Sequence, residues 1–102
     1  MIKAQILLHD LKAGVLEQRE NGKYTFTYHD EYKGAPVSLT MPLIKKTHDF
    51  DSFPPFFEGL LPEGAMLEAL LRKYKIDRSD YFRQLIKVGK DVVGAVTIEE
   101  LG

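Results

Sequence analysis

The spacing of apolar residues changes about halfway along the chain, and this change limits the folds that the chain can adopt. In the first half, apolar and polar residues alternate, as in YTFTY at residues 24–28. Alternation is typical of a strand with one buried face. From Met66 to Tyr74 the apolar residues lie three or four positions apart, the spacing of an amphipathic helix. The sequence therefore predicts an α+β fold: a mostly antiparallel sheet of N-terminal hairpins, two helices packed on one side and a C-terminal strand.

Turn residues set the expected limits of the strands. The predicted strands span residues 4–8, 14–18, 23–28, 37–41 and 92–98. A polar turn at 9–12 joins the first two. Asn21-Gly22 predicts a two-residue hairpin turn, because both residues tolerate positive φ. Pro42 ends the fourth strand or places it on an edge of the sheet.

Two helices are expected after the strands. The first covers residues 63–75, with Pro62 at its first helical position and Glu63 in its first turn. Asp77 is expected to cap the second helix, and Gly89 is expected to end it. The predicted apolar stripes are Met66, Leu67, Leu70, Leu71 and Tyr74 in the first helix, and Tyr81, Phe82, Leu85 and Ile86 in the second.

The segment FPPFFEGLLPEG, residues 53–64, lies between sheet and helices. It contains three phenylalanines and three prolines, and the prolines prevent an ordinary helix or central strand. A proline-rich connection of this kind, between a sheet and a helix, often buries its aromatic side chains in the core. On that interpretation at least two of Phe53, Phe56 and Phe57 are buried, together with Leu60 or Leu61. The alternative is that part of the segment forms a surface for a partner, and the sequence leaves both interpretations open.

Length and composition predict one compact domain over residues 1–102. The chain is 44% hydrophobic and 28% charged, which suits a single core. It has no cysteine, so disulfides and thiolate chemistry are excluded. The first ten residues do not resemble a secretory signal, and no apolar run approaches the roughly 20 residues that cross a bilayer. We therefore expect a cytoplasmic protein without membrane contact.

Charge is nearly balanced overall but uneven along the chain. The net charge is −1, whereas residues 72–90 contain seven basic and two acidic residues. Such a patch is usually a solvated helix face, and less often a contact for an acidic partner or for phosphates. Balanced total charge leaves little attraction for nucleic acid, so direct nucleic-acid binding is not expected.

No catalytic or cofactor-binding motif is present in the sequence. It has neither a glycine-rich nucleotide loop nor a Walker lysine pattern, and its three histidines form no pair with zinc-ligand spacing. The stretch HDFD at 48–51 is better interpreted as a solvated loop than as a metal site. The aromatic residues of 24–28 could stack on bases, but a role in the core is favoured. We expect no enzymatic activity, no cofactor and no metal.

Three blocks in order resemble the N-terminal subdomain of HipA-type serine/threonine kinases. They are PVSLTMPL at 36–43, FPPFFEGLLPEG at 53–64 and LIKVGKDVVGAV at 85–96. The first hairpins fit as well, so the resemblance covers essentially the whole chain. In that family the subdomain continues into a larger catalytic portion, whose residues have no counterpart here.

A stand-alone form of this subdomain is similar to HipS, the small component of three-gene toxin–antitoxin systems. The resemblance implies a partner, the kinase HipT, that lacks the subdomain, and a helix-turn-helix protein, HipB, that binds DNA. It implies that the small protein binds HipT and neutralises its toxicity. The expected partner-binding residues are Phe53, Phe56, Phe57, Leu60, Leu61, Glu63 and Met66.

Three alternatives stay open. The chain could be a fragment of a full-length HipA-type kinase, or a module that assists a kinase in recognising its substrate. It could also be an accessory that contributes to binding of a repressor complex at operator DNA. The residues expected to contact DNA in that last case are Arg72, Lys73, Lys75, Arg83 and Lys87.

Overall fold

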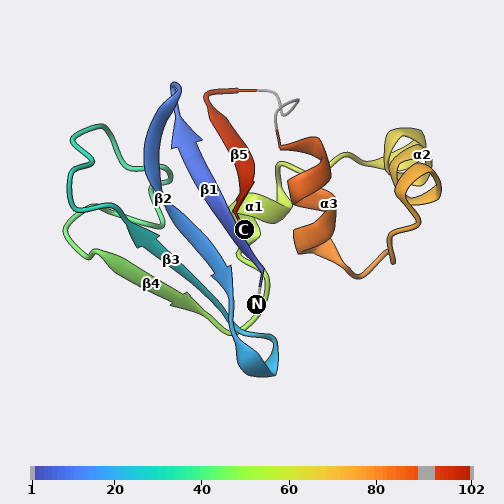
Figure 1. The fold of residues 1–102 in the computed structure, drawn as a ribbon, viewed down its shortest axis with the longest axis horizontal. Coiled ribbons are helices and arrows are strands. Elements are labelled where there is room, and N and C mark those ends of the chain that lie inside the picture. The colour runs from blue at the N-terminus through green and yellow to red at the C-terminus, as the bar shows by residue number, and fades with distance from the viewer. Residues whose placement is uncertain (1, 90–93, 102) are drawn as a thin grey trace.

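A five-stranded antiparallel sheet forms the larger part of the protein (Figure 1). The computed structural model describes residues 2–89 and 94–101. The strands are β1 (Lys3–Leu8), β2 (Leu11–Gln18), β3 (Tyr24–Tyr28), β4 (Thr47–Phe50) and β5 (Val96–Leu101), in the spatial order β4-β3-β2-β1-β5. The helices are the 3-10 turn η1 (Glu20–Gly22), α1 (Pro55–Glu58), α2 (Gly64–Tyr74) and α3 (Tyr81–Val88). The predicted α+β class is confirmed.

The turn between β1 and β2 is shorter than predicted. His9 and Asp10 both adopt positive φ, and this closes the turn with two residues. Leu11 and Lys12, expected in the turn, already pair with Leu8 and Leu7. The prediction of a four-residue turn was wrong because it did not anticipate positive φ at both His9 and Asp10, which allows a tighter turn.

The connection between β2 and β3 is longer than predicted. Asn21 and Gly22 have the expected positive φ values of 67° and 75°. However, β2 ends at Gln18, which pairs with Tyr24, so residues 19–23 form the connection. The Arg19 N–H donates to the Lys23 carbonyl at 2.7 Å and closes this loop. The two-residue hairpin was therefore wrong in length, although the backbone conformation at Asn-Gly was right.

Residues 37–41 do not form the predicted strand. Val37 and Met41 are buried, as the alternation indicated, but Leu39 is 95% exposed and the segment joins no sheet. The Tyr28 hydroxyl holds this loop instead: it accepts from the Val37 N–H at 2.9 Å and donates to the Met41 carbonyl at 2.5 Å. Burial raises the pKa of Tyr28, so the hydroxyl stays protonated and able to donate at neutral pH.

The outer strand β4 lies where a solvated loop was expected. His48 is buried in it, and the His48 Nε2 donates to the Pro42 carbonyl at 3.1 Å. Phe26 of β3 pairs with His48 across the sheet. The prediction failed because a short edge strand has little apolar patterning of its own.

The core lies between the sheet and the helices α1 and α3. Its largest side chains include Phe26 from β3, Phe57 from α1 and Phe82 from α3, each less than 2% exposed. The rings of Phe26 and Phe57 are 6.1 Å apart. Since Phe26 and Tyr28 are buried, they are unavailable as a base-stacking platform, and the core interpretation is confirmed.

The start of α3 differs from the prediction, whereas its end matches it. The cap is Asp80, whose carboxylate accepts from the Arg83 N–H, while Asp77 lies before the helix. Gly89 follows the last helical residue as expected, and its carbonyl accepts from the Ile98 N–H at 2.9 Å. A Cβ at Gly89 would lie 2.4 Å from the Ile98 carbonyl oxygen, so only glycine allows this approach of α3 to β5.

The helix α2 begins later than predicted and buries nothing. Its cap is Glu63 and its first residue is Gly64, so Pro62 lies before the helix. None of its side chains is buried, and in Figure 1 the helix stands at the far side of α3 from the sheet. The predicted apolar stripe of this helix, which was expected to pack on one side of the sheet, therefore does not contribute to the core.

Candidate interaction surface

The Pro/Phe segment divides between the core and the surface. Phe53 and Phe57 are buried; the Phe53 ring lies 5.2 Å from that of Tyr24. Phe56 is half-buried and packs edge-on against Phe57 at 5.2 Å. Leu60 is also half-buried. Two of the three phenylalanines thus leave little side-chain surface for a partner.

The prolines explain why this segment turns where it does. Pro54 is extended, as expected for a residue before proline, and Pro55 starts α1. The Pro54 carbonyl accepts from the N–H groups of Phe57 and Glu58. This single turn points Phe57 into the core and leads the chain out towards α2.

A groove of about 530 Å³ lies where this segment, α2 and α3 meet. Its lining is mainly apolar, with two lysines and no carboxylate. The lining residues are Gly59, Leu60, Leu61, Pro62, Met66, Ala69, Leu70, Lys73, Tyr74, Lys87 and Val88. We call this site the α2–α3 groove. Of the apolar stripe of α2, Met66, Leu70 and Tyr74 line this groove, whereas Leu67 lines a separate hollow beside Arg78 and Tyr81.

The charge at the groove is gathered around one aromatic ring. The ammonium nitrogens of Lys73 and Lys87 lie 5.3 Å and 5.0 Å from the centre of the Tyr74 ring, within cation–π range. Among residues 2–89 and 94–101, neither lysine has a carboxylate within ion-pair distance. One end of an apolar groove therefore carries two positive charges that the described part of the chain does not neutralise.

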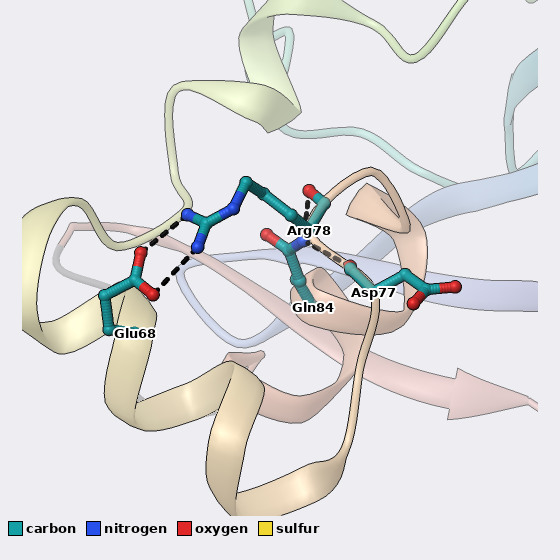
Figure 2. Close-up of polar contacts among 4 residues, drawn as sticks. All are labelled: Glu68, Asp77, Arg78 and Gln84. Carbon is teal, nitrogen blue, oxygen red and sulfur yellow. Dashed lines mark hydrogen bonds and ion pairs between the residues drawn. The ribbon is translucent and has the colours of Figure 1, made fainter.

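Polar contacts connect α2 to the start of α3 (Figure 2). The Arg78 guanidinium donates to both carboxylate oxygens of Glu68, at 2.6 Å and 2.8 Å. The Gln84 amide donates to the carbonyls of Asp77 and Arg78, at 3.2 Å and 3.0 Å. The hydrogen bonds from Arg78 lower the pKa of Glu68. A two-pronged ion pair between exposed side chains thus joins α2 to the segment before α3, alongside the packing of the half-buried Leu67, Leu70 and Leu71.

The expected partner-binding residues separate into groups. Leu60, Leu61 and Met66 line the α2–α3 groove, and Met66 is 74% exposed. Glu63 is exposed at the start of α2. Six further lining residues were not among the expected contact residues, namely Gly59, Pro62, Ala69, Leu70, Tyr74 and Val88. Leu70 and Tyr74 belong to the predicted apolar stripe, but that spacing alone did not indicate a partner-binding role.

The expected basic residues do not form one continuous patch at the groove. Lys73 and Lys87 reach the groove, whereas Arg83 pairs with Asp80 at 3.2 Å. Arg72 and Lys75 are exposed on and just after α2, outside the groove lining.

Within the described residues, no group of three or more histidine, cysteine, aspartate and glutamate side chains is arranged to hold a metal ion. Across residues 2–89 and 94–101, every helix is too short or too polar to traverse a bilayer.

Comparison with known proteins identifies the family. Residues 4–99 match the family model described as the HipA N-terminal domain. The chain belongs to this family. A solved structure of the N-terminal domain of HipA toxin superposes with a TM-score of 0.80 at 28% identity, covering 100% of this chain and 94% of that one.

Other relatives of this HipA N-terminal domain differ in length. An uncharacterised Haemophilus influenzae protein is 33% identical over 96 residues, covering 94% of this chain and 90% of that protein. A putative kinase of Sinorhizobium fredii, Y4dM, is 29% identical over 103 residues, and the match covers 91% of this chain but 25% of the kinase. HipA in a Shewanella oneidensis complex with HipB and operator DNA has the same fold, with a TM-score of 0.74, 24% identity and coverage of 94% of this chain and 23% of that one. The HipA N-terminal domain thus occurs both in a protein of similar length and within chains about four times longer.

Proposed function

We propose that this HipA N-terminal domain is an antitoxin-like protein that binds a HipT-type serine/threonine kinase and neutralises it by contact. It has no catalytic activity of its own in this proposal. A HipB-like DNA-binding protein belongs to the same complex. The observation that carries the proposal is α2, a helix with an apolar stripe and no buried side chain, beside a groove lined by Leu60, Leu61 and Met66.

The family match supports a kinase as the partner. In the putative kinase of similar sequence, the matching region is a quarter of a longer chain. A surface that meets the rest of such a chain would be apolar at its centre with a charged rim, as obligate interfaces are. The α2–α3 groove is mainly apolar and carries two lysines, gathered around Tyr74. In a full-length HipA-type kinase the same surface would serve within one chain.

Two modes of inhibition are compatible with this surface. Docking of α2 could obstruct the entrance for nucleotide or protein substrate, with Met66 as the most exposed apolar side chain of the helix. Alternatively, it could hold a kinase loop in an inactive position. In both modes Pro54, Pro55 and Pro62 restrict the segment before binding and lower the entropy cost of docking.

The decisive experiment combines the purified protein with a HipT-type kinase from the same genome. We expect a stable complex on gel filtration and a loss of phosphate transfer from ATP as the protein is titrated in. The sign of the change separates an inhibitor from a substrate-recognition module: a rise in kinase activity, or no complex, contradicts the proposal.

Substitution of Met66 locates the contact. Met66→Asp places a charge on the exposed face of α2, where it removes no core packing, so binding should weaken while the fold persists. Leu39→Asp is the matched control, because Leu39 is equally apolar and 95% exposed but lies in the loop after β3. Equal affinities for both variants would contradict the proposed surface.

A second candidate function is an accessory role at operator DNA. It is supported by the basic side chains of α2 and α3, of which Lys73 and Lys87 have no ion pair among the described residues. With a net charge of −1, such a role would depend on a larger complex.

A further inference from the structure

The α2–α3 groove has two ends of different chemistry. One end is apolar and is formed by Leu60, Leu61 and Met66; the other carries Lys73 and Lys87 around the Tyr74 ring. An occupant that filled only the apolar end would leave two ammonium groups partly desolvated and unpaired. An occupant that was only acidic would leave the apolar end in water. Each end therefore specifies a different part of the ligand.

We propose that the α2–α3 groove receives a segment of the kinase in which apolar side chains lie next to carboxylates. The proposal rests on the proposed function, since it takes the kinase as the partner. The apolar side chains occupy the space between Leu60 and Leu70, and the carboxylates pair with Lys73 and Lys87. The groove volume of about 530 Å³ accommodates several side chains, which suits a peptide segment better than a single protruding residue.

The two lysines are suited to recognise carboxylates. Each ammonium is positioned over the Tyr74 ring, so part of its conformational freedom is already restricted before binding. No carboxylate lines the groove, and therefore no internal ion pair has to break. Glu68, the acidic residue of α2, pairs with Arg78 and not with Lys73, and this pair joins α2 to the segment before α3.

A second copy of this chain is the competing occupant. Glu99, Glu100 and Leu101 are exposed at the end of β5 and combine two carboxylates with an apolar side chain. Their backbones already pair with β1, so they form a rigid strand and offer fewer ways to fit a groove than a mobile kinase segment would. Self-association through this strand is an outcome that the experiment below would detect.

The test measures the affinity of the full chain for the HipT-type kinase by calorimetry. The double variant Lys73→Glu/Lys87→Glu should bind about tenfold more weakly or worse, because it opposes like charges. The wild-type affinity should fall as salt rises, whereas the weaker affinity of the double variant should rise, because salt screens the repulsion between like charges. Lys45→Glu makes the same change on a distant exposed loop and should leave affinity unchanged.

Crosslinking identifies the occupant directly. The chain has no cysteine, so Ala69→Cys creates a single thiol on an exposed groove position that can carry a photoactivated crosslinker. Mass spectrometry should find it joined to a kinase peptide that contains leucine, phenylalanine or a similar residue beside aspartate or glutamate. The same label on Leu39→Cys should give no such product.

The outcomes separate the two proposals. If wild type forms no complex with the kinase, both proposals fail. If wild type binds but the double variant binds equally well, or the crosslinked peptide lacks carboxylates, the groove inference fails and the proposed function stands. Crosslinks to Glu99–Leu101 of a second copy would overturn the inference in favour of self-association.

Discussion

The Tyr28 hydroxyl supplies hydrogen bonds to the backbone of residues 37–41, which do not pair as a strand. It satisfies the Val37 N–H and the Met41 carbonyl in a buried place. Tyr28→Phe leaves both groups without a partner, so we expect it to lower the free energy of unfolding by about 1–3 kcal/mol. Urea denaturation measures this change. Tyr32→Phe removes an exposed hydroxyl bond to Ala35 and should cost clearly less; equal effects would contradict the role of Tyr28.

Gly89 allows α3 to approach β5 closely. In Gly89→Ala the new Cβ would meet the Ile98 carbonyl oxygen at 2.4 Å, so backbone must shift. We expect a loss of about 1–3 kcal/mol of unfolding free energy, the usual cost of overpacking. Gly59→Ala is the matched control, since Gly59 is also right-handed helical and its nearest neighbour would lie at 3.4 Å. Thermal denaturation that ranks the two variants equally would contradict this account.

For single residues, the alternation of apolar and polar positions was enough to predict which side chains are buried in several cases. Phe26, Val37 and Met41 are buried as the alternation indicated. Alternation does not specify a hydrogen-bonding partner, however, and the bond from Tyr28 to Met41 joins residues 13 positions apart. For that reason the burial of Val37 and Met41 was right, whereas the pairing of 37–41 in a strand, with Leu39 on the same face, was wrong.

At the level of elements, the Glu68–Arg78 pair joins α2 to the segment before α3. The pKa of Glu68 is lowered in the folded protein from its ordinary value near 4.5. The ion pair therefore stabilises α2 fully when the pH is above that ordinary value. This stabilisation is lost as the pH falls through the lowered pKa of the folded state. We expect amide protection in α2 to decrease in acid more than in α3, which has buried side chains. Hydrogen exchange followed at neutral pH and at about pH 3 measures this difference.

Glu68→Gln isolates the effect of the carboxylate. It removes the titrating group and should reduce protection of α2 at neutral pH while abolishing the selective change in acid. A wild-type pH response retained in this variant would contradict the assignment to Glu68.

Elements with strong patterns were predicted and weakly patterned ones were missed. The last strand, predicted at 92–98, is β5 at Val96–Leu101, and residues 92 and 93 of that prediction lie outside the described part of the chain. The strands β1, β2 and β5 contain short apolar runs, and β3, α2 and α3 have clear periodicity, whereas the edge strand β4 has only four residues, three of them polar, THDF. The apolar stripe of α2 was found, but the helix was expected to pack on one side of the sheet. Core-facing and partner-facing stripes have the same period, so the sequence does not distinguish them.

For the molecule as a whole, the balanced charge leads to a prediction about DNA. The local excess of positive charge around residues 72–90 is offset elsewhere, and the total is −1. We expect the isolated protein to show no salt-sensitive binding to duplex DNA between about 50 and 200 mM salt. Fluorescence anisotropy with a labelled operator duplex tests this. An affinity that falls steeply with salt would favour the DNA accessory function over the kinase-binding function.

The separation of α2 from the core has an evolutionary consequence. Side chains of the buried core, such as Phe57 and Leu85, and the groove-lining side chains of α2, such as Met66 and Ala69, belong to different groups. Substitutions on the groove face of α2 therefore change no core packing, and they are tolerated on stability grounds. If a kinase segment binds there, the two proteins are free to diverge together. Related pairs in one cell can then avoid binding each other's partner while each small protein keeps the same fold.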